Sequence, residues 1–184
     1  MTGRTDMTAE NKKFMTISYA VGSLLIIVDF ITKYVANSTL VFQERAATGI
    51  KWLSLLLTHN TGYHYIFGDI KNHKLWSTFG LLMLCILLFS LTKSMLSEKN
   101  SFYKKLYAVI LMLTIGAGGN VVEILVTGKA TDFFVLEPFP WPSNICDQYI
   151  NGIIYIIMPI MIIRLIIDKF KTTKENSAET NTDS

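Results

Sequence analysis

Residues that could form disulfides or bind a metal ion are scarce in this chain. Its 184 residues include 2 cysteines and 3 histidines. Two thiols, Cys85 and Cys146, cannot build a disulfide framework or a four-cysteine metal site. His59, His64 and His73 lie in one short region without an H-E-x-x-H motif or another compact set of ligands. We therefore expect two free thiols and no bound metal ion.

Charged residues are also few, and their distribution argues against nucleic acid as a partner. They make up 17% of the chain, the net charge is only +3, and 51% of the residues are hydrophobic. This composition is too apolar for an ordinary soluble domain, so membrane lipid is the expected surrounding. The basic residues flank apolar runs and do not form the basic stripe with interleaved aromatics that a nucleic-acid surface would show.

Four apolar runs are long enough to cross a bilayer, whose hydrocarbon core needs about 20 helical residues. We predict transmembrane helices at approximately residues 14–36, 75–95, 103–126 and 149–168. The first run is too long for the apolar segment of a typical secretory signal peptide, and it contains Asp29 and Lys33. The predicted fold is an all-α membrane protein, a four-transmembrane-helix bundle that forms a single domain over residues 1–171.

The basic residues predict the orientation of this bundle. They crowd the N-terminal segment, the second connection and the segment after the last span: Arg4, Lys12, Lys13, Lys93, Lys99, Lys104, Lys105, Lys169, Lys171 and Lys174. By the positive-inside rule, both termini and the second connection face the cytoplasm. The loops 37–74 and 127–148 then face outward, although the longer one also contains some basic residues.

Two segments outside the spans have a distinct character. In the first outer loop, the mostly apolar residues 50–57 are followed by Thr61-Gly62 and the aromatic residues 63–67. This pattern predicts a small outward-facing β-strand and loop element between the first two spans. The polar tail, residues 172–184, contains no apolar run, and we predict that it is disordered in the cytoplasm.

Polar side chains gather toward the outward ends of the spans. Asp29 and Lys33 are spaced i, i+4, so they share one helix face. An ionisable group inside a bilayer costs at least ~2.5 kcal/mol, so such groups should face the bundle interior or a wet cleft. The gathered residues are Asp29, Lys33, Asn120, Glu123, Asp132, Asn144 and Asp147.

Asp132 and Asp147 are the pair of residues best suited to catalysis. Two carboxylates held close together cannot both ionise cheaply, which leaves one base to activate water and one acid to protonate a leaving amine. That is aspartic-protease chemistry, and it needs no metal ion or organic cofactor. A non-catalytic alternative is that Asp132 and Asp147 are solvated surface charges. Likewise, Asp29 and Lys33 could serve only to fix helix packing.

The order of the polar motifs resembles the lipoprotein signal peptidase family, also called signal peptidase II, from the first span to the fourth. Each motif alone is weak, but the combination in this order and on one membrane side is specific. The segments that carry the resemblance are Asp29-Phe30-Ile31-Thr32-Lys33, His59-Asn60-Thr61-Gly62, Gly116-Ala117-Gly118-Gly119-Asn120, Gly128-Lys129-Ala130-Thr131-Asp132-Phe133 and Asn144-Ile145-Cys146-Asp147.

The resemblance implies a role for each matching position. Asp132 and Asp147 correspond to the catalytic aspartates. The other positions would bind substrate or support the aspartates, with Asp29 and Lys33 as a supporting pair and the glycines allowing close approach of helices. These supporting positions are Asn60, Asn120, Asn144, Glu123, Asp29, Lys33, Gly62 and Gly119.

The chain departs from the family pattern after the glycine segment. The family has an aspartate and an arginine where this chain has Glu123 and Ile124, and isoleucine cannot supply the donors of a guanidinium. Lys129 is a conceivable substitute for that arginine. The small residues expected after Gly62 are Tyr63-His64-Tyr65 here, and the aromatic residue expected before Asn144 is a serine.

The resemblance implies an intramembrane aspartic endopeptidase that removes signal peptides from bacterial prolipoproteins. Its substrates would carry a lipobox with a diacylglyceryl-modified cysteine, and the cut would fall just before that cysteine at the outer face of the cytoplasmic (inner) membrane. The departures motivate one alternative, a non-catalytic relative that binds lipoprotein signal peptides or lipid. A small ion or solute transporter is a third reading.

Overall fold

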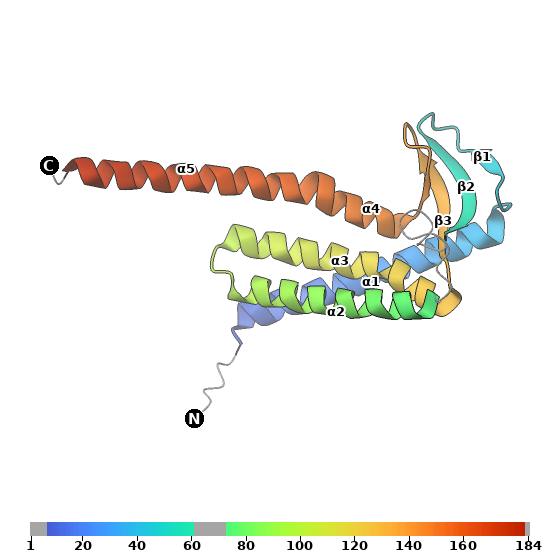
Figure 1. Cartoon of the computed structure of the whole chain (residues 1–184), viewed down its shortest axis with the longest axis horizontal. Helices are drawn as coiled ribbons and strands as arrows, with labels where there is room; N and C mark the ends of the chain where they lie inside the picture. Colours follow the sequence, from blue (N-terminus) through green and yellow to red (C-terminus); the bar gives the residue numbers. More distant parts are fainter. Residues whose placement is uncertain (1–6, 61–72, 183–184) are drawn as a thin grey trace, which may run out of the picture.

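The computed structural model describes residues 7–60 and 73–182, and it shows a helical bundle with a small sheet at one end (Figure 1). Four helical segments are long and apolar enough to cross a membrane, the last of them over Ile145–Lys171. This confirms the predicted four-helix membrane fold. The helices are α1 (Ala9–Thr39), α2 (His73–Ser97), α3 (Ser101–Thr127), α4 (Ile145–Gly152), a π-helical turn (Ile153–Ile157) and α5 (Met158–Thr182).

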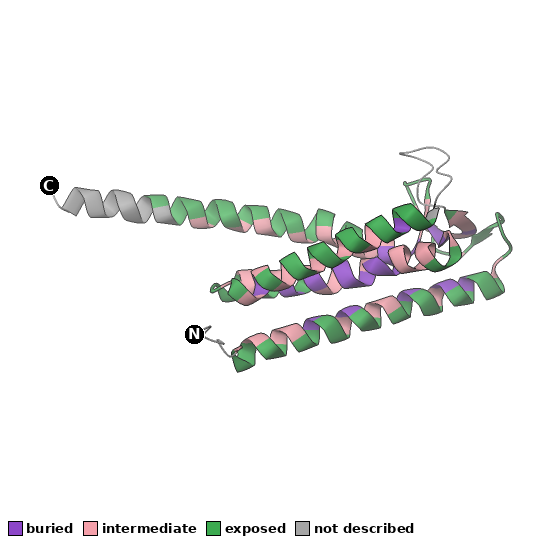
Figure 2. Cartoon of the chain, turned by 60° about the horizontal axis from the view of Figure 1, so that its bottom comes forward, coloured by how far each residue is buried: buried purple, intermediate pink, exposed green. Residues whose placement is uncertain are grey.

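Helix α3 lies at the centre of the bundle, packed against both α1 and α2. Its buried face includes Ala108, Leu111 and Ile115, which pack with Met95 of α2. On α1, a Cβ at Gly22 would lie 2.6 Å from the Cβ of Ile115, so only glycine lets these two helices approach so closely. The buried residues accordingly follow the facing sides of α1 and α3 (Figure 2).

The outward faces of the helices carry large apolar side chains. Ile31 of α1, Leu82 of α2 and Ile163 of α5 are each more than half exposed. A soluble protein rarely exposes continuous apolar helix faces, whereas lipid favours them. These faces are therefore the expected lipid contacts of a membrane bundle.

A four-stranded antiparallel sheet covers one end of the bundle, in the order β1 (Arg45–Ala47), β2 (Leu53–Asn60), β3 (Ala130–Leu136) and β4 (Pro142–Ser143). The predicted strand element between the first two spans is thus present. The prediction that residues 127–148 form only a loop is wrong, because this segment contains β3 and β4. Strand pairing between β2 and β3 joins residues 70 to 83 positions apart, which no local pattern reveals. The expected aromatic segment 63–67 lies outside the described residues.

Two further boundaries differ from the prediction. The last span begins at Ile145, four residues earlier than expected, which places Asp147 in the first turn of α4. At the other end, α5 continues to Thr182, where the sequence analysis expected a disordered tail from residue 172. The preceding helix supplies the nucleus for extension, and four of the eleven residues in 172–182, which are Lys, Glu or Ala, have good helix propensity.

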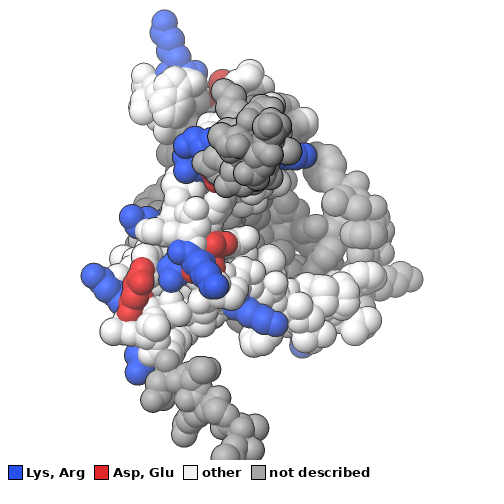
Figure 3. All heavy atoms as spheres, turned by 90° about the vertical axis from the view of Figure 1, so that its left-hand side faces the viewer, with Lys and Arg blue, Asp and Glu red and all other residues white. Residues whose placement is uncertain are grey.

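The end of the bundle opposite the sheet is rich in basic residues. Figure 3 looks at this end, where Lys and Arg side chains outnumber acidic ones on the visible described surface. The basic residues flanking the helices at this end are Lys12, Lys13, Lys93, Lys99, Lys104, Lys105, Lys169 and Lys171. The two ends of the bundle therefore differ in charge as well as in structure.

Candidate active site

Asn144 connects the two aspartates at the sheet end of the bundle. Its side-chain Nδ2 donates to Asp132 Oδ1 at 2.6 Å, and its backbone N donates to Asp147 Oδ2 at 3.0 Å. Asp132 is held by strand β3, and Asp147 by the first turn of α4. One residue thus contacts both carboxylates, which brings together groups from two separate elements.

The start of α4 explains why Asn144 stands in this position. Its Oδ1 accepts the backbone N–H of Asp147 at 3.1 Å, while the Asp147 carboxylate accepts the Asn144 N–H. This reciprocal pair is a capping box, which stabilises the first helical turn. The same hydrogen bonds that begin the helix therefore fix the orientation of the Asp147 side chain.

Burial gives Asp132 an unusual acidity. Only 4% of the residue is exposed, and Asn144 is fully buried. Burial, together with the negative charge of Asp147, raises the pKa of Asp132 to about 7, although hydrogen bonds from Asn144 and Asn60 oppose this shift. Asp132 can therefore hold a proton close to neutral pH.

Asn120 links Asp147 to a buried lysine. Its Nδ2 donates to Asp147 Oδ1 at 3.0 Å, and its Oδ1 accepts from Lys33 Nζ at 2.5 Å. Lys33 also lies 2.7 Å from a carboxylate oxygen of Asp29 and 2.7 Å from one of Glu123. An ammonium group is only a donor, so Asn120 must turn its oxygen toward Lys33 and its amide hydrogens toward Asp147.

Asp29 closes the far side of this cluster. It is fully buried, and its Oδ1 accepts the backbone N–H of Cys146 at 3.2 Å. A Cβ at Gly119 would lie 2.8 Å from Cys146 Sγ and 3.2 Å from Asp29 Oδ2, so a larger residue there would displace α1 or α4. Cys146 and Cys85 are both free thiols, as predicted.

Glu123 joins α1 to the strand that holds Asp132. Its Oε2 pairs with Lys33, while its Oε1 accepts the backbone N–H of Thr131 at 3.0 Å. Thr131 directly precedes Asp132 in β3. The longer side chain of glutamate thus reaches two elements with one carboxylate.

A second row of hydrogen bonds reaches Thr131 from the surface. Lys129 Nζ donates to His59 Nδ1 at 3.0 Å, His59 Nε2 donates to Asn37 Oδ1 at 3.1 Å, and Asn37 Nδ2 donates to Thr131 Oγ1 at 3.3 Å. Partial burial and the nearby Lys129 lower the pKa of His59, which favours the neutral ring that this row requires. Lys129, considered above as a substitute for the missing arginine, is thus engaged with His59.

Sequence reasoning missed Asn37, Thr131 and Cys146 as members of the site. Asn37 lies one helical turn after Lys33, and this spacing was the available signal for it. Thr131 and Cys146 stand inside two of the family motifs, but they take part through strand pairing and helix packing, which a motif does not show. Of the predicted residues, Gly62 lies outside the described part of the chain. The others, including Asn60 and Gly119, lie around the two aspartates.

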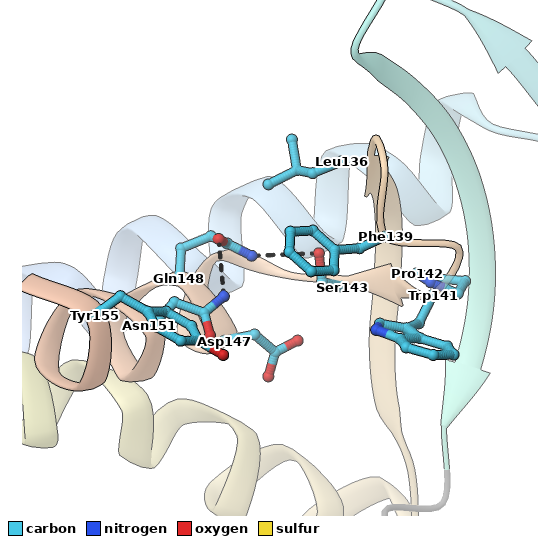
Figure 4. Close-up of a pocket in the computed structure, with 9 residues that line it drawn as sticks. All are labelled: Leu136, Phe139, Trp141, Pro142, Ser143, Asp147, Gln148, Asn151 and Tyr155. Atoms are coloured by element: carbon cyan, nitrogen blue, oxygen red, sulfur yellow. Dashed lines mark hydrogen bonds between the residues drawn. The ribbon is translucent and has the colours of Figure 1, made fainter.

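A cavity of about 440 Å³ opens beside Asp147. Figure 4 shows the Asp147 carboxylate between Tyr155 of the π-helical turn and Trp141 of the loop between β3 and β4, with Gln148 and Phe139 above it. An uncovered space next to a carboxylate pair is where a substrate would be expected.

Comparison with known proteins agrees with this architecture. The sequence profile of the family described as Signal peptidase (SPase) II matches residues 21–164. The lipoprotein signal peptidases of Francisella tularensis subsp. mediasiatica (strain FSC147) and subsp. novicida (strain U112) are each 31% identical to this chain over 141 residues. These residues are 73% of this chain and 84% of each relative.

Solved structures share the fold. A bacterial membrane enzyme determined by the in meso method at 2.3 Å resolution has a TM-score of 0.62 and 21% identity, covering 85% of this chain and 91% of that one. A second, at 1.9 Å resolution, has a TM-score of 0.61 and 22% identity, covering 83% and 94%.

Four membrane-spanning helices and a family match of this extent define a multi-pass membrane protease of bacterial type. The chain belongs to the signal peptidase II family, as its motifs had indicated.

Proposed function

We propose that this protein is an aspartic endopeptidase that removes the signal peptide of bacterial prolipoproteins, with Asp132 and Asp147 as its catalytic residues. The cut falls just before a diacylglyceryl-modified cysteine. The observation that supports this best is the pair of hydrogen bonds from Asn144 to both carboxylates, at 2.6 and 3.0 Å. Because two N–H groups of one residue donate to both carboxylates, the two acids are held beside the same residue, as a pair that activates one water molecule requires.

The environments of the two aspartates suggest different roles. Asp132 holds a proton near neutral pH, because burial and its acidic neighbour raise its pKa to about 7. Asp147 borders the cavity, where a water molecule can reach its carboxylate, and it accepts hydrogen bonds from Asn120 and from the Asn144 backbone. Asp147 is then the base and Asp132 the acid.

Hydrolysis follows from these roles. Asp147 takes a proton from water, whose oxygen bonds to the carbonyl carbon while Asp132 donates its proton to the carbonyl oxygen. When the resulting diol collapses, one hydroxyl returns its proton to Asp132. Asp147 protonates the amide nitrogen as the C–N bond breaks. The products are the carboxylic acid of the signal peptide and the free amine of the modified cysteine.

We also propose that both termini lie in the cytoplasm and that the active site lies at the outer membrane face. The basic residues at the end opposite the sheet support this orientation under the positive-inside rule. The sheet and the two aspartates are then on the side where a translocated signal peptide ends. The departures that motivated the non-catalytic alternative leave both aspartates joined through Asn144, which favours the peptidase.

The direct test replaces each aspartate with asparagine. We expect Asp132→Asn and Asp147→Asn each to lower cleavage of a prolipoprotein by about 10³-fold or more, because an amide cannot exchange the required proton. Cleavage is measured by a gel-shift assay, and activity in cells is measured by rescue of bacteria depleted of their own lipoprotein signal peptidase. Asp168→Asn is the matched control, since that carboxylate bonds Tyr103 at the opposite end of the bundle. Full cleavage by either active-site variant would overturn the mechanism.

A further inference from the structure

Apart from Asp147 itself, the cavity beside this carboxylate is lined by residues that take no part in the hydrolysis. It lies between the β3–β4 connection and the first turns of the last span (Figure 4). Its lining includes three aromatic residues and three uncharged polar residues. The aromatic residues are Phe139, Trp141 and Tyr155, and the polar ones are Ser143, Gln148 and Asn151.

The polar residues form a connected row. Asn151 Nδ2 donates to Gln148 Oε1 at 3.2 Å, and Gln148 Nε2 donates to Ser143 Oγ at 3.3 Å. A side-chain amide carries two N–H donors and an oxygen with two lone pairs, so each has capacity beyond its bond within the row. The row can therefore bind one more uncharged polar group.

The aromatic rings leave a large surface uncovered. Phe139, Trp141 and Tyr155 are 59%, 61% and 71% exposed, so most of each ring is available to a ligand. Aromatic rings pack well against another aromatic ring, in stacked or edge-to-face arrangements. A lipid acyl chain fits this cavity less well, because it would bury the amides without giving them hydrogen bonds. The lining suits an aromatic side chain with a polar tip.

The position of the cavity selects one part of the substrate. Its walls come from the sheet connection, which lies outside the spans, and from the start of the last span. In the proposed orientation, the signal peptide lies within the membrane and the chain after the cut continues outward from it. The substrate residue that follows the modified cysteine is therefore the one expected to lie next to the cavity.

We propose that this cavity binds the side chain of the substrate residue that follows the lipid-modified cysteine, and that it prefers tyrosine there. This inference rests on the proposed peptidase function. The rings of Trp141 and Tyr155 contact the substrate ring, and the amide row of Gln148 and Asn151 bonds its hydroxyl. The family's arginine, which is Ile124 in this chain, is not needed for this contact with the substrate side chain.

The test uses diacylglyceryl-cysteine peptides in detergent micelles with the full-length protein. Tyrosine, phenylalanine or alanine is placed after the cysteine in one set and before it in a second set. For residues after the cysteine, we expect kcat/KM for tyrosine to exceed that for alanine by about tenfold, the discrimination typical of one well-matched pocket. We expect phenylalanine to fall between them.

Two variants separate the ring contact from the polar contact. Ser143→Phe fills the cavity and should bring the tyrosine-to-alanine ratio of kcat/KM close to one. Gln148→Ala should remove the preference for tyrosine over phenylalanine and keep that for phenylalanine over alanine, which also tests the proposal if Ser143→Phe does not fold. The matched control Ser38→Phe adds the same bulk at an exposed site on α1, where the serine bonds its own helix, and should keep the wild-type ratios.

Equal kcat/KM for tyrosine and alanine after the cysteine would overturn the proposal, as would ratios unchanged by both Ser143→Phe and Gln148→Ala. A preference seen only in the second set would assign the cavity to the signal-peptide side and would also overturn it. In all these cases the peptides are cleaved, so the proposed function stands. If the wild-type protein cleaves none of the peptides, the proposed function itself fails.

Discussion

Lys33 organises the charged cluster through a single ammonium group. It contacts Asp29, Glu123 and Asn120, so three acceptors match its three N–H donors. Only 4% of its side chain is exposed. Its attraction to two carboxylates offsets the cost of burying the charges. Its hydrogen bond to Asn120 fixes the orientation of the amide that donates to Asp147.

Removing the Lys33 charge tests this arrangement. We expect Lys33→Met to lower stability by about 3–5 kcal/mol, because it leaves two buried carboxylates uncompensated. The triple variant Lys33→Met, Asp29→Asn, Glu123→Gln should recover most of that stability, since it contains no unpaired charge at these positions. Cleavage should stay low in both, because the Asn120 amide is no longer oriented. Thermal unfolding in detergent and the gel-shift assay measure the two effects, and wild-type stability of Lys33→Met would contradict the expectation.

The acidity of Asp132 predicts a pH dependence. Because its proton is needed for catalysis and its pKa is about 7, kcat/KM should fall about tenfold per pH unit above that value. The pKa is raised from 3.8, so the folded state binds this proton more tightly than the unfolded state. The resulting stabilisation is full below pH 3.8 and is lost as pH rises toward 7. Initial rates and unfolding measured across this range check both, and a rate that is constant from neutral pH upward would exclude Asp132 as the acid.

At the scale of elements, the start of α4 serves both folding and the site. The capping box fixes the first turn, and the same asparagine side chain reaches across to β3. Strand β3 is itself anchored from two helices, through Glu123 of α3 and Asn37 of α1. The position of Asp132 relative to Asp147 therefore depends on how four elements, α1, α3, β3 and α4, pack together.

Two substitutions at Asn144 separate its roles. Asn144→Ala removes the cap and should cost about 1 kcal/mol of stability, whereas Asn144→Ser keeps a capping oxygen and should cost little. Serine is too short to reach Asp132, so we expect cleavage to fall about 100-fold or more in both variants. Unfolding measurements and the gel-shift assay are compared for the pair. Normal cleavage by Asn144→Ser would show that the bond to Asp132 is dispensable.

At the scale of the whole molecule, a basic helical end and a sheet end define the axis of the bundle. The apolar outer faces of the helices lie between these two ends (Figures 1 and 2). A bundle of this kind places its polar cluster near one face of the membrane. The charge difference between the two ends predicts which face this is.

Labelling of single cysteines tests the orientation. In a Cys85→Ala background, Lys51→Cys marks the sheet end and Lys99→Cys marks the basic end, and both residues are exposed. We expect a membrane-impermeant thiol reagent to label Lys51→Cys in intact spheroplasts and Lys99→Cys only after lysis. The buried Cys146 should stay unreactive in the background protein. The reverse pattern would place the active site in the cytoplasm.

The sequence alone determined the four spans and the residue types at one end of them. Span length is a local property, because each stretch must match the thickness of the hydrocarbon core by itself. The i, i+4 spacing of Asp29 and Lys33 is equally local, and the structure confirms their ion pair at 2.7 Å. The family motifs added Asp132 and Asp147 as candidates without showing how they meet.

Only the tertiary structure decided how these groups are joined. The pairing of β2 with β3, the contact of Asn144 with both aspartates, and the entry of Asn37 and Thr131 into the site each depend on segments far apart in the chain. A hydrogen bond requires a distance and direction that are set by the packing of whole elements, whereas a sequence pattern specifies only which residue types are present.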